Sequence, residues 1–163
     1  MQGQGRLVAL LAGLIALASP VVGDAQQKPA APPAAYRPGL GDLMTATVQP
    51  RHIKLGLAGQ QGNWLYATYE LHELQEAFDR AAAVWPTWRN FSITEMMKSV
   101  AKEPMAAVGE AIKAGDVGRF TTAYGQLTAA CNTCHQSAER GVIVVQSPEA
   151  SSFPDQDFRA LKK

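Results

Sequence analysis

The sequence has only two cysteines among its 163 residues, and it carries almost no excess of charge. Its 15 lysines and arginines balance 14 aspartates and glutamates, for a formal net charge of +1. Binding to nucleic acid or to an anionic membrane surface usually needs a clear basic excess, so we expect neither partner. The sequence also lacks an internal repeat, a glycine-rich phosphate-binding loop and a visible catalytic constellation, and we do not expect an enzyme.

No apolar run is long enough to span a bilayer. Leu7–Ala18 (LVALLAGLIALA) has a dozen residues, whereas a transmembrane helix needs about 20. A short basic start ending at Arg6 precedes this run, and small residues follow it at Gly23 and Ala25, which is the pattern of a secretory signal peptide. We expect residues 1–25 to be cleaved and the mature chain to reach the periplasm without a membrane span. An uncleaved N-terminal anchor is the alternative.

Composition divides the remaining chain into three parts. Residues 26–38 are rich in proline and alanine and predict an extended linker. Residues 39–140 have apolar residues at spacings of three and four, which indicates one helical domain. Residues 141–163 form a tail whose apolar residues need cover, so we expect Val142–Val145 and Phe153 to fold back over the domain. A loosely ordered end of the tail is the alternative.

Four helices are expected within residues 39–140. The first, residues 40–58, contains Pro50, so we expect a kink there or two pieces. Pro104 is expected to kink the third helix. Each of the three later helices follows a residue whose side chain can accept a hydrogen bond from the first turn. These capping residues are Asn63, Ser92 and Asp116. Helices of this length with short connections predict an all-α fold, an antiparallel four-helix bundle.

The second helix, residues 63–83, has a continuous apolar stripe. We expect its opposite face to be solvated and to carry His72 and the acidic pair Glu70 and Glu73. On this interpretation the two carboxylates are not catalytic groups. The methionines of the third helix, such as Met97, are interpreted as core side chains rather than metal ligands.

Both cysteines lie in the stretch CNTCH, residues 131–135. On a helix, Cys131 and Cys134 project to the same side, where two thiols can form thioethers with the two vinyl groups of a haem. His135 is four residues after Cys131 and can serve as the proximal ligand of the iron. The apolar stripe of the last helix runs through both cysteines, so the motif should face the core. We therefore expect one covalently bound haem c.

Three other interpretations of CNTCH agree less well with the sequence. A structural zinc site needs four ligands, and outside the motif only His52 and His72 remain. A thioredoxin-like redox pair needs a βαβ setting, which the helical periodicity does not provide. A local disulfide, common in exported proteins, would give no reason for His135 or for a position facing the core.

An exported helical chain with a single CxxCH late in its last helix resembles the class II c-type cytochromes, the four-helix cytochrome c-prime group. The resemblance covers residues 39–140, and its specific part is the CxxCH. It implies that Cys131 and Cys134 carry the haem and that His135 ligates the iron. It also implies a distal residue on the first helix, which corresponds to Met44: a methionine ligand in low-spin electron-transfer members, a non-ligating apolar residue in cytochrome c-prime. Family members often dimerise, so a homodimer is among the implied assemblies.

The chain departs from this family in its tail of more than twenty residues and at His52, in QPRHIKL. An imidazole binds iron well, so His52 is the alternative sixth ligand. The rise of about 1.5 Å per residue favours Met44, because antiparallel helices would bring residues 40–44 level with the motif and leave His52 about 12 Å away. An iron with no sixth protein ligand is the third possibility.

Together these features favour a periplasmic monohaem electron carrier whose donors and acceptors are other exported redox proteins. The main alternative is a gas-binding or gas-sensing haem protein of the cytochrome c-prime kind, with an open distal side. A small haem subunit of a periplasmic oxidoreductase is a third hypothesis.

Overall fold

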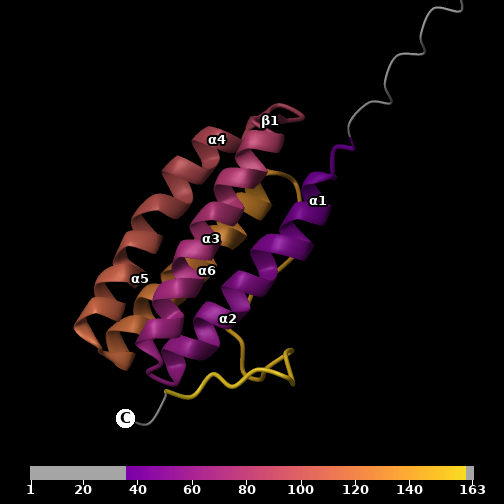
Figure 1. Ribbon diagram of the computed structural model, residues 1–163. Helices are drawn as coiled ribbons and strands as arrows, with labels where there is room; N and C mark the ends of the chain where they lie inside the picture. The colour runs from indigo at the N-terminus through magenta and orange to yellow at the C-terminus, as the bar shows by residue number, and fades with distance from the viewer. Residues whose placement is uncertain (1–35, 161–163) are drawn as a thin grey trace, which may run out of the picture. The chain divides into compact units, whose positions relative to one another are not determined.

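The computed structural model describes residues 36–160. The expected signal peptide, residues 26–35 of the expected linker and residues 161–163 of the tail lie outside the described residues. The described chain is mostly helical, so the expected all-α class is confirmed (Figure 1). It also contains a small antiparallel hairpin, β1 (Thr87–Trp88) and β2 (Phe91–Ser92), between the second and third helical segments.

The first helical segment is continuous through Pro50. It consists of α1 (Leu40–Leu43), the π-helix η1 (Met44–Val48) and α2 (Gln49–Gln60). Proline lacks an N–H and its ring collides with the carbonyl four residues earlier, so it disturbs the α-helical turn that precedes it. A wider π turn accommodates this disturbance. The segment therefore has a π turn before the proline rather than a break.

The third helical segment repeats this arrangement. It consists of α4 (Ile93–Met96), η2 (Met97–Ala101) and α5 (Lys102–Ala114). Pro104 lies in the first turn of α5, three residues after the end of η2, much as Pro50 lies two residues after the end of η1. Both prolines thus widen the helix on their N-terminal side, which sequence periodicity alone does not reveal.

The three expected N-caps are confirmed. Asn63 caps α3 (Trp64–Val84) by accepting a hydrogen bond from the backbone N–H of Tyr66. Ser92 accepts one from the third residue of α4. The Asp116 carboxylate caps α6 (Val117–Ser137) in the same way.

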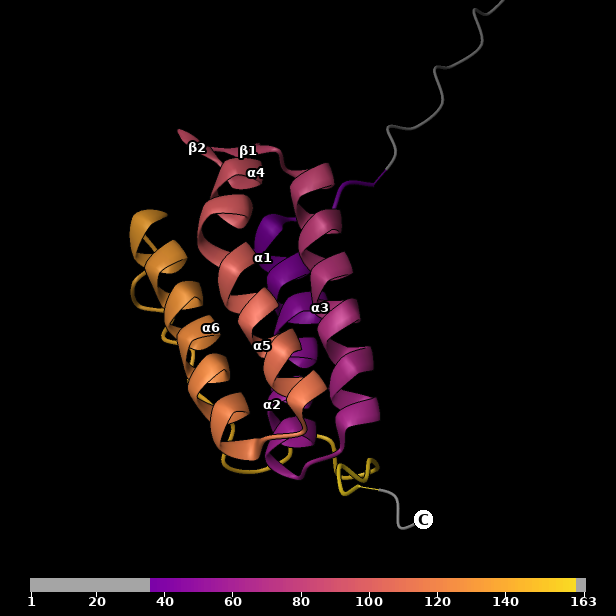
Figure 2. The same cartoon turned by 90° about the vertical axis from the view of Figure 1, so that its left-hand side faces the viewer.

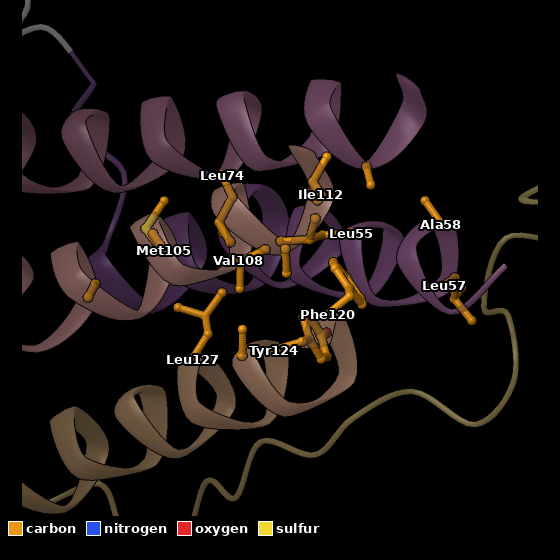
Figure 3. Close-up of a cluster of buried hydrophobic side chains, with 14 of the residues drawn as sticks. Leu55, Leu57, Ala58, Leu74, Met105, Val108, Ile112, Phe120, Tyr124 and Leu127 are labelled. Atoms are coloured by element: carbon orange, nitrogen blue, oxygen red, sulfur yellow. The ribbon is translucent and has the colours of Figure 1, made fainter. Parts of the chain in front are cut away.

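The helical segments lie side by side, and consecutive segments are joined at alternate ends (Figures 1 and 2). α2 packs on α3 and α5 packs on α6, while α2 also contacts α6 and α3 contacts α5. Their apolar faces meet in one core, shown in Figure 3. Leu55, Leu74, Val108 and Leu127, one from each of these four helices, are completely buried there.

The prediction that Glu70 lies on a solvated face of α3 is wrong. Its side chain is only 1% exposed, and Arg51 of α2 forms ion pairs with both Glu70 (3.2 Å) and Glu73 (3.0 Å). Burial raises the pKa of Glu70, and the hydrogen bond and charge of Arg51 oppose that rise. The partner lies on another helix, so the pattern of α3 alone could not predict this pair. His72 is exposed, as expected, and lies 3.3 Å from Glu76.

Two glycines let α2 approach α6 closely. A Cβ atom at Gly56 would lie 2.6 Å from the hydroxyl oxygen of Tyr124, and one at Gly59 would overlap the ring of Phe120. Both aromatic rings belong to α6 and are almost completely buried. The absence of a side chain at these positions therefore sets how near the two helices come.

We predict that Gly59→Ala lowers the free energy of unfolding by about 1–3 kcal/mol, because the new methyl group must displace a buried ring. Gly125→Ala is the matched control, since Gly125 lies in α6 with open space around its Cα. It should raise stability by about 0.5–1 kcal/mol through better helix propensity. Urea unfolding of both variants measures the difference, and equal effects would contradict the close approach.

Candidate functional site

The last turns of α6 line a pocket to which CNTCH contributes Cys131, Cys134 and His135. Cys131, Cys134 and His135 are half-buried and share this pocket, which holds about 910 Å³ of empty space including its open mouth. The two thiols belong to neighbouring turns of one helix, as their spacing predicts. The structure thus brings the three motif residues to a single concave site.

The walls of this pocket come from all the helical segments and from the hairpin. Most of the lining side chains are apolar. They include Leu40, Met44, Phe78, Trp88, Ile93, Met96, Met97, Leu127 and Ile143. A concave, mostly apolar pocket with a few polar groups at fixed positions is typical of a cofactor or small-molecule site.

Both π-helical turns contribute to these walls. Met44 belongs to η1, and Met97 and Ala101 belong to η2. π turns inside α-helices occur frequently at functional sites, because they change the direction of side chains. The sequence signal for them is a proline shortly after each turn, from which the sequence predicted a kink or two pieces at Pro50 and a kink at Pro104.

A second pocket adjoins the first and shares Met44, Cys131, His135 and Ile143 with it. It holds about 1150 Å³ of empty space and lies between the first helical segment and the tail. Gln49, His52 and tail residues 143–148 also line it. The motif therefore also borders this second pocket, which is larger than the first and has the tail as its outer wall.

His135 has one ring nitrogen already engaged. Its Nδ1 lies 2.8 Å from the carbonyl oxygen of Ile143 in the tail. A carbonyl only accepts hydrogen bonds, so Nδ1 carries the proton, and Nε2 of the neutral ring keeps its lone pair. Metal-binding histidines commonly donate their other N–H to a carbonyl in this way. Sequence analysis did not identify Ile143 because backbone atoms leave no signature in the sequence.

Burial keeps the thiols uncharged. The pKa of Cys131 is raised to about 11, mainly by burial and further by the nearby Cys134. Burial also raises the pKa of Cys134. Neutral thiols suit an apolar pocket, where a thiolate would lose its hydration without gaining a partner.

Both candidates for a sixth ligand line the second pocket with Cys131 and His135, but of the two only Met44 also lines the first pocket, which holds both cysteines. Met97, interpreted from the sequence as a core side chain, packs on the core and also lines this pocket. Met96, which sequence analysis did not single out, is a further thioether there.

His52 lies deeper, with both ring nitrogens in contact with hydroxyl groups of α6. Nε2 is 3.0 Å from Oγ1 of Thr128, and Nδ1 is 2.9 Å from the hydroxyl oxygen of Tyr124. The imidazole also stacks on the Tyr124 ring, with centroids 4.7 Å apart. Burial lowers the pKa of His52 to about 4. His52 borders only the second pocket, and coordination would cost it one of these hydrogen bonds.

His52 should make stability depend on pH. Its pKa is about 4 in the folded chain and 6.5 in the unfolded chain. Between these values the unfolded chain binds more protons, so the free energy of unfolding falls as pH falls, by about 3 kcal/mol over the window. Urea unfolding measured between pH 4 and pH 6.5 should show this fall in the free energy of unfolding in the wild type and a much smaller fall in His52→Gln. His72→Gln removes an exposed histidine and should keep the wild-type slope; an unchanged slope in His52→Gln would contradict a buried neutral imidazole.

Within residues 36–160, no group of three or more His, Cys, Asp or Glu side chains is arranged to hold a bare metal ion. None of the helices described by the structure is long and apolar enough to cross a membrane. Comparisons with protein-family models, with curated proteins and with solved structures found no match to this chain.

Proposed function

We propose that this chain is an exported c-type cytochrome with one covalent haem c, folded as an antiparallel four-helix bundle, that carries single electrons between other periplasmic redox proteins. The observation that carries the proposal is the pocket of CNTCH. Two cysteines on adjacent turns and a histidine with Nδ1 already engaged line one apolar site. That combination is what a haem held by two thioethers and an imidazole requires.

The apolar lining of the pocket suits a haem in its chemistry. Apolar side chains from every helical segment surround the motif, and they would enclose a flat, mostly apolar macrocycle. Cys131 and Cys134 would hold it at one wall, and Nε2 of His135 would be the proximal ligand. When bound, the haem supplies a one-electron iron couple whose potential depends on the axial ligands and on burial.

We propose Met44 as the sixth ligand. It is half-buried and lines the pocket with both cysteines and His135, whereas both nitrogens of His52 are engaged with α6. Its thioether needs to break no hydrogen bond before it can bind. A methionine and histidine pair raises the reduction potential relative to two imidazoles, which suits an electron carrier.

A gas-binding function is the second candidate. It is favoured by the apolar walls around Met44, Met96 and Met97, which offer no imidazole other than His135 in the first pocket. If no thioether occupies the sixth coordination position of the iron, this side of the pocket is an apolar cavity suited to a small neutral molecule.

Covalent attachment is the first test of the proposal. After export from a host that attaches haem to CxxCH proteins, the wild type should keep its haem in a denaturing gel, as measured by haem staining. Cys131→Ser with Cys134→Ser should abolish the stain, because no thiol remains to form a thioether. Thr133→Ala changes an exposed residue of the same motif and should keep it. Undiminished covalent haem in the double variant would refute the proposal.

Axial ligation is the second test, measured by absorption spectra of the ferric and ferrous protein. We expect a low-spin wild type, a high-spin Met44→Ala variant, and low-spin His52→Ala, Met96→Ala and Met97→Ala variants. The last two are matched controls, because they remove thioethers from the same pocket. A low-spin spectrum lost only in His52→Ala would make His52 the ligand. A high-spin wild type that binds carbon monoxide readily would favour the gas-binding function.

A further inference from the structure

The chain reverses sharply after the CNTCH helix. The backbone N–H of Glu139 donates to the carbonyl of Gln136 (3.1 Å), and that of Arg140 donates to the carbonyl of His135 (2.7 Å). Glu139 has a φ of 57°, the left-handed conformation that such a helix end requires. These two bonds with a left-handed residue form a Schellman motif. The tail is thereby turned back toward the helix that it has just left.

Three hydrogen bonds then hold the returning tail against the motif. The side-chain amide of Asn132 donates from Nδ2 to the carbonyl of Val145 (2.9 Å) and accepts at Oδ1 from the N–H of the same residue (2.7 Å). One turn further along α6, Nδ1 of His135 donates to the carbonyl of Ile143 (2.8 Å). Asn132 and His135 are three residues apart and so lie on neighbouring positions of one helix face.

Asn132 is suited to this role in a way that most residues are not. A side-chain amide offers both an N–H donor and an oxygen acceptor, which match the C=O and N–H of a single backbone residue. Asn132 thereby binds both backbone groups of Val145, its N–H and its C=O. This contact places the carbonyl of Ile143, two residues earlier, next to the imidazole of His135. The other residue between the two cysteines, Thr133, is exposed, and its hydroxyl donates to the carbonyl of Ala129 in its own helix.

We propose that residues 141–148 are a strap on the proximal side of the site, and that Asn132 is a positioning residue that acts through it on His135. The strap keeps His135 in the tautomer with Nδ1 protonated and holds its ring in place. This inference rests on the proposed function, because its effect on an iron centre follows only if His135 is the proximal ligand. A hydrogen bond from Nδ1 makes the imidazole a stronger donor through Nε2, which stabilises ferric over ferrous iron.

The test compares Asn132→Ala, Asn132→Asp and Thr133→Ala in the full exported chain. Loss of both side-chain bonds in Asn132→Ala should speed hydrogen exchange at the Val145 N–H by roughly tenfold, because the strap detaches from α6. Asn132→Asp keeps the acceptor but loses the donor, so its effect should be intermediate. Thr133→Ala should exchange as the wild type does.

The second readout is the midpoint potential of the haem protein. Asn132→Ala should raise it, because His135 loses its fixed hydrogen bond, and Thr133→Ala should leave it unchanged. Faster hydrogen exchange at Val145 in Asn132→Ala with an unchanged midpoint potential would refute the positioning role. Unchanged exchange in that variant would refute the attachment of the strap through Asn132. A purely structural role would lower stability without a shift in potential.

The strap and the proposed function can fail separately. If the exported chain carried no haem, the proposed function would fail, and nitrogen NMR of the His135 ring would still report its tautomer. The strap predicts a protonated Nδ1 in the wild type and in Thr133→Ala, and a mixture of tautomers in Asn132→Ala. A protonated Nε2 in the wild-type chain without haem would overturn the strap whatever the protein binds.

Discussion

The contact between α2 and α6 sets the relative position of the two helices that carry the candidate ligands. Gly56 and Gly59 let the backbone of α2 approach the buried rings of Phe120 and Tyr124. The register that results brings His52 against the hydroxyl groups of α6, and it brings η1 beside CNTCH two turns further along. A shift of two turns between these helices would place His52 at the level where Met44 now lies, because the two residues are about 12 Å apart along the helix.

The tail completes the site from the outside. It supplies the carbonyl of Ile143 to His135 and is attached through Asn132 of the motif itself. Farther along, Phe158 is buried and stacks on Tyr66 at the start of α3. Residues 143–148 of the tail therefore belong to the surroundings of CNTCH, and we interpret them as part of the proposed haem site.

Local features were predictable because their causes are local. A side chain that caps a helix, or two thiols on adjacent turns, depends on residues within about one turn of each other. Glu70 was misassigned because its partner, Arg51, lies on another helix. Met96 was missed because no pattern within one helix shows which methionine will face a pocket that several helices enclose. The sequence indicates the π turns only indirectly, through Pro50 and Pro104. A proline in a helix can produce a kink, a break or a wider turn, and the local sequence does not decide among them.

By itself, the sequence determined the helical class, the helix starts and the side of α6 on which CNTCH lies, since propensity, capping and spacing act over a few residues. Only the tertiary structure decided which side chains surround the motif. It brought Met44 into the pocket, engaged both nitrogens of His52 elsewhere and turned the tail back to His135. These outcomes depend on the register between helices and on backbone carbonyls, which arise from the packing of the whole chain.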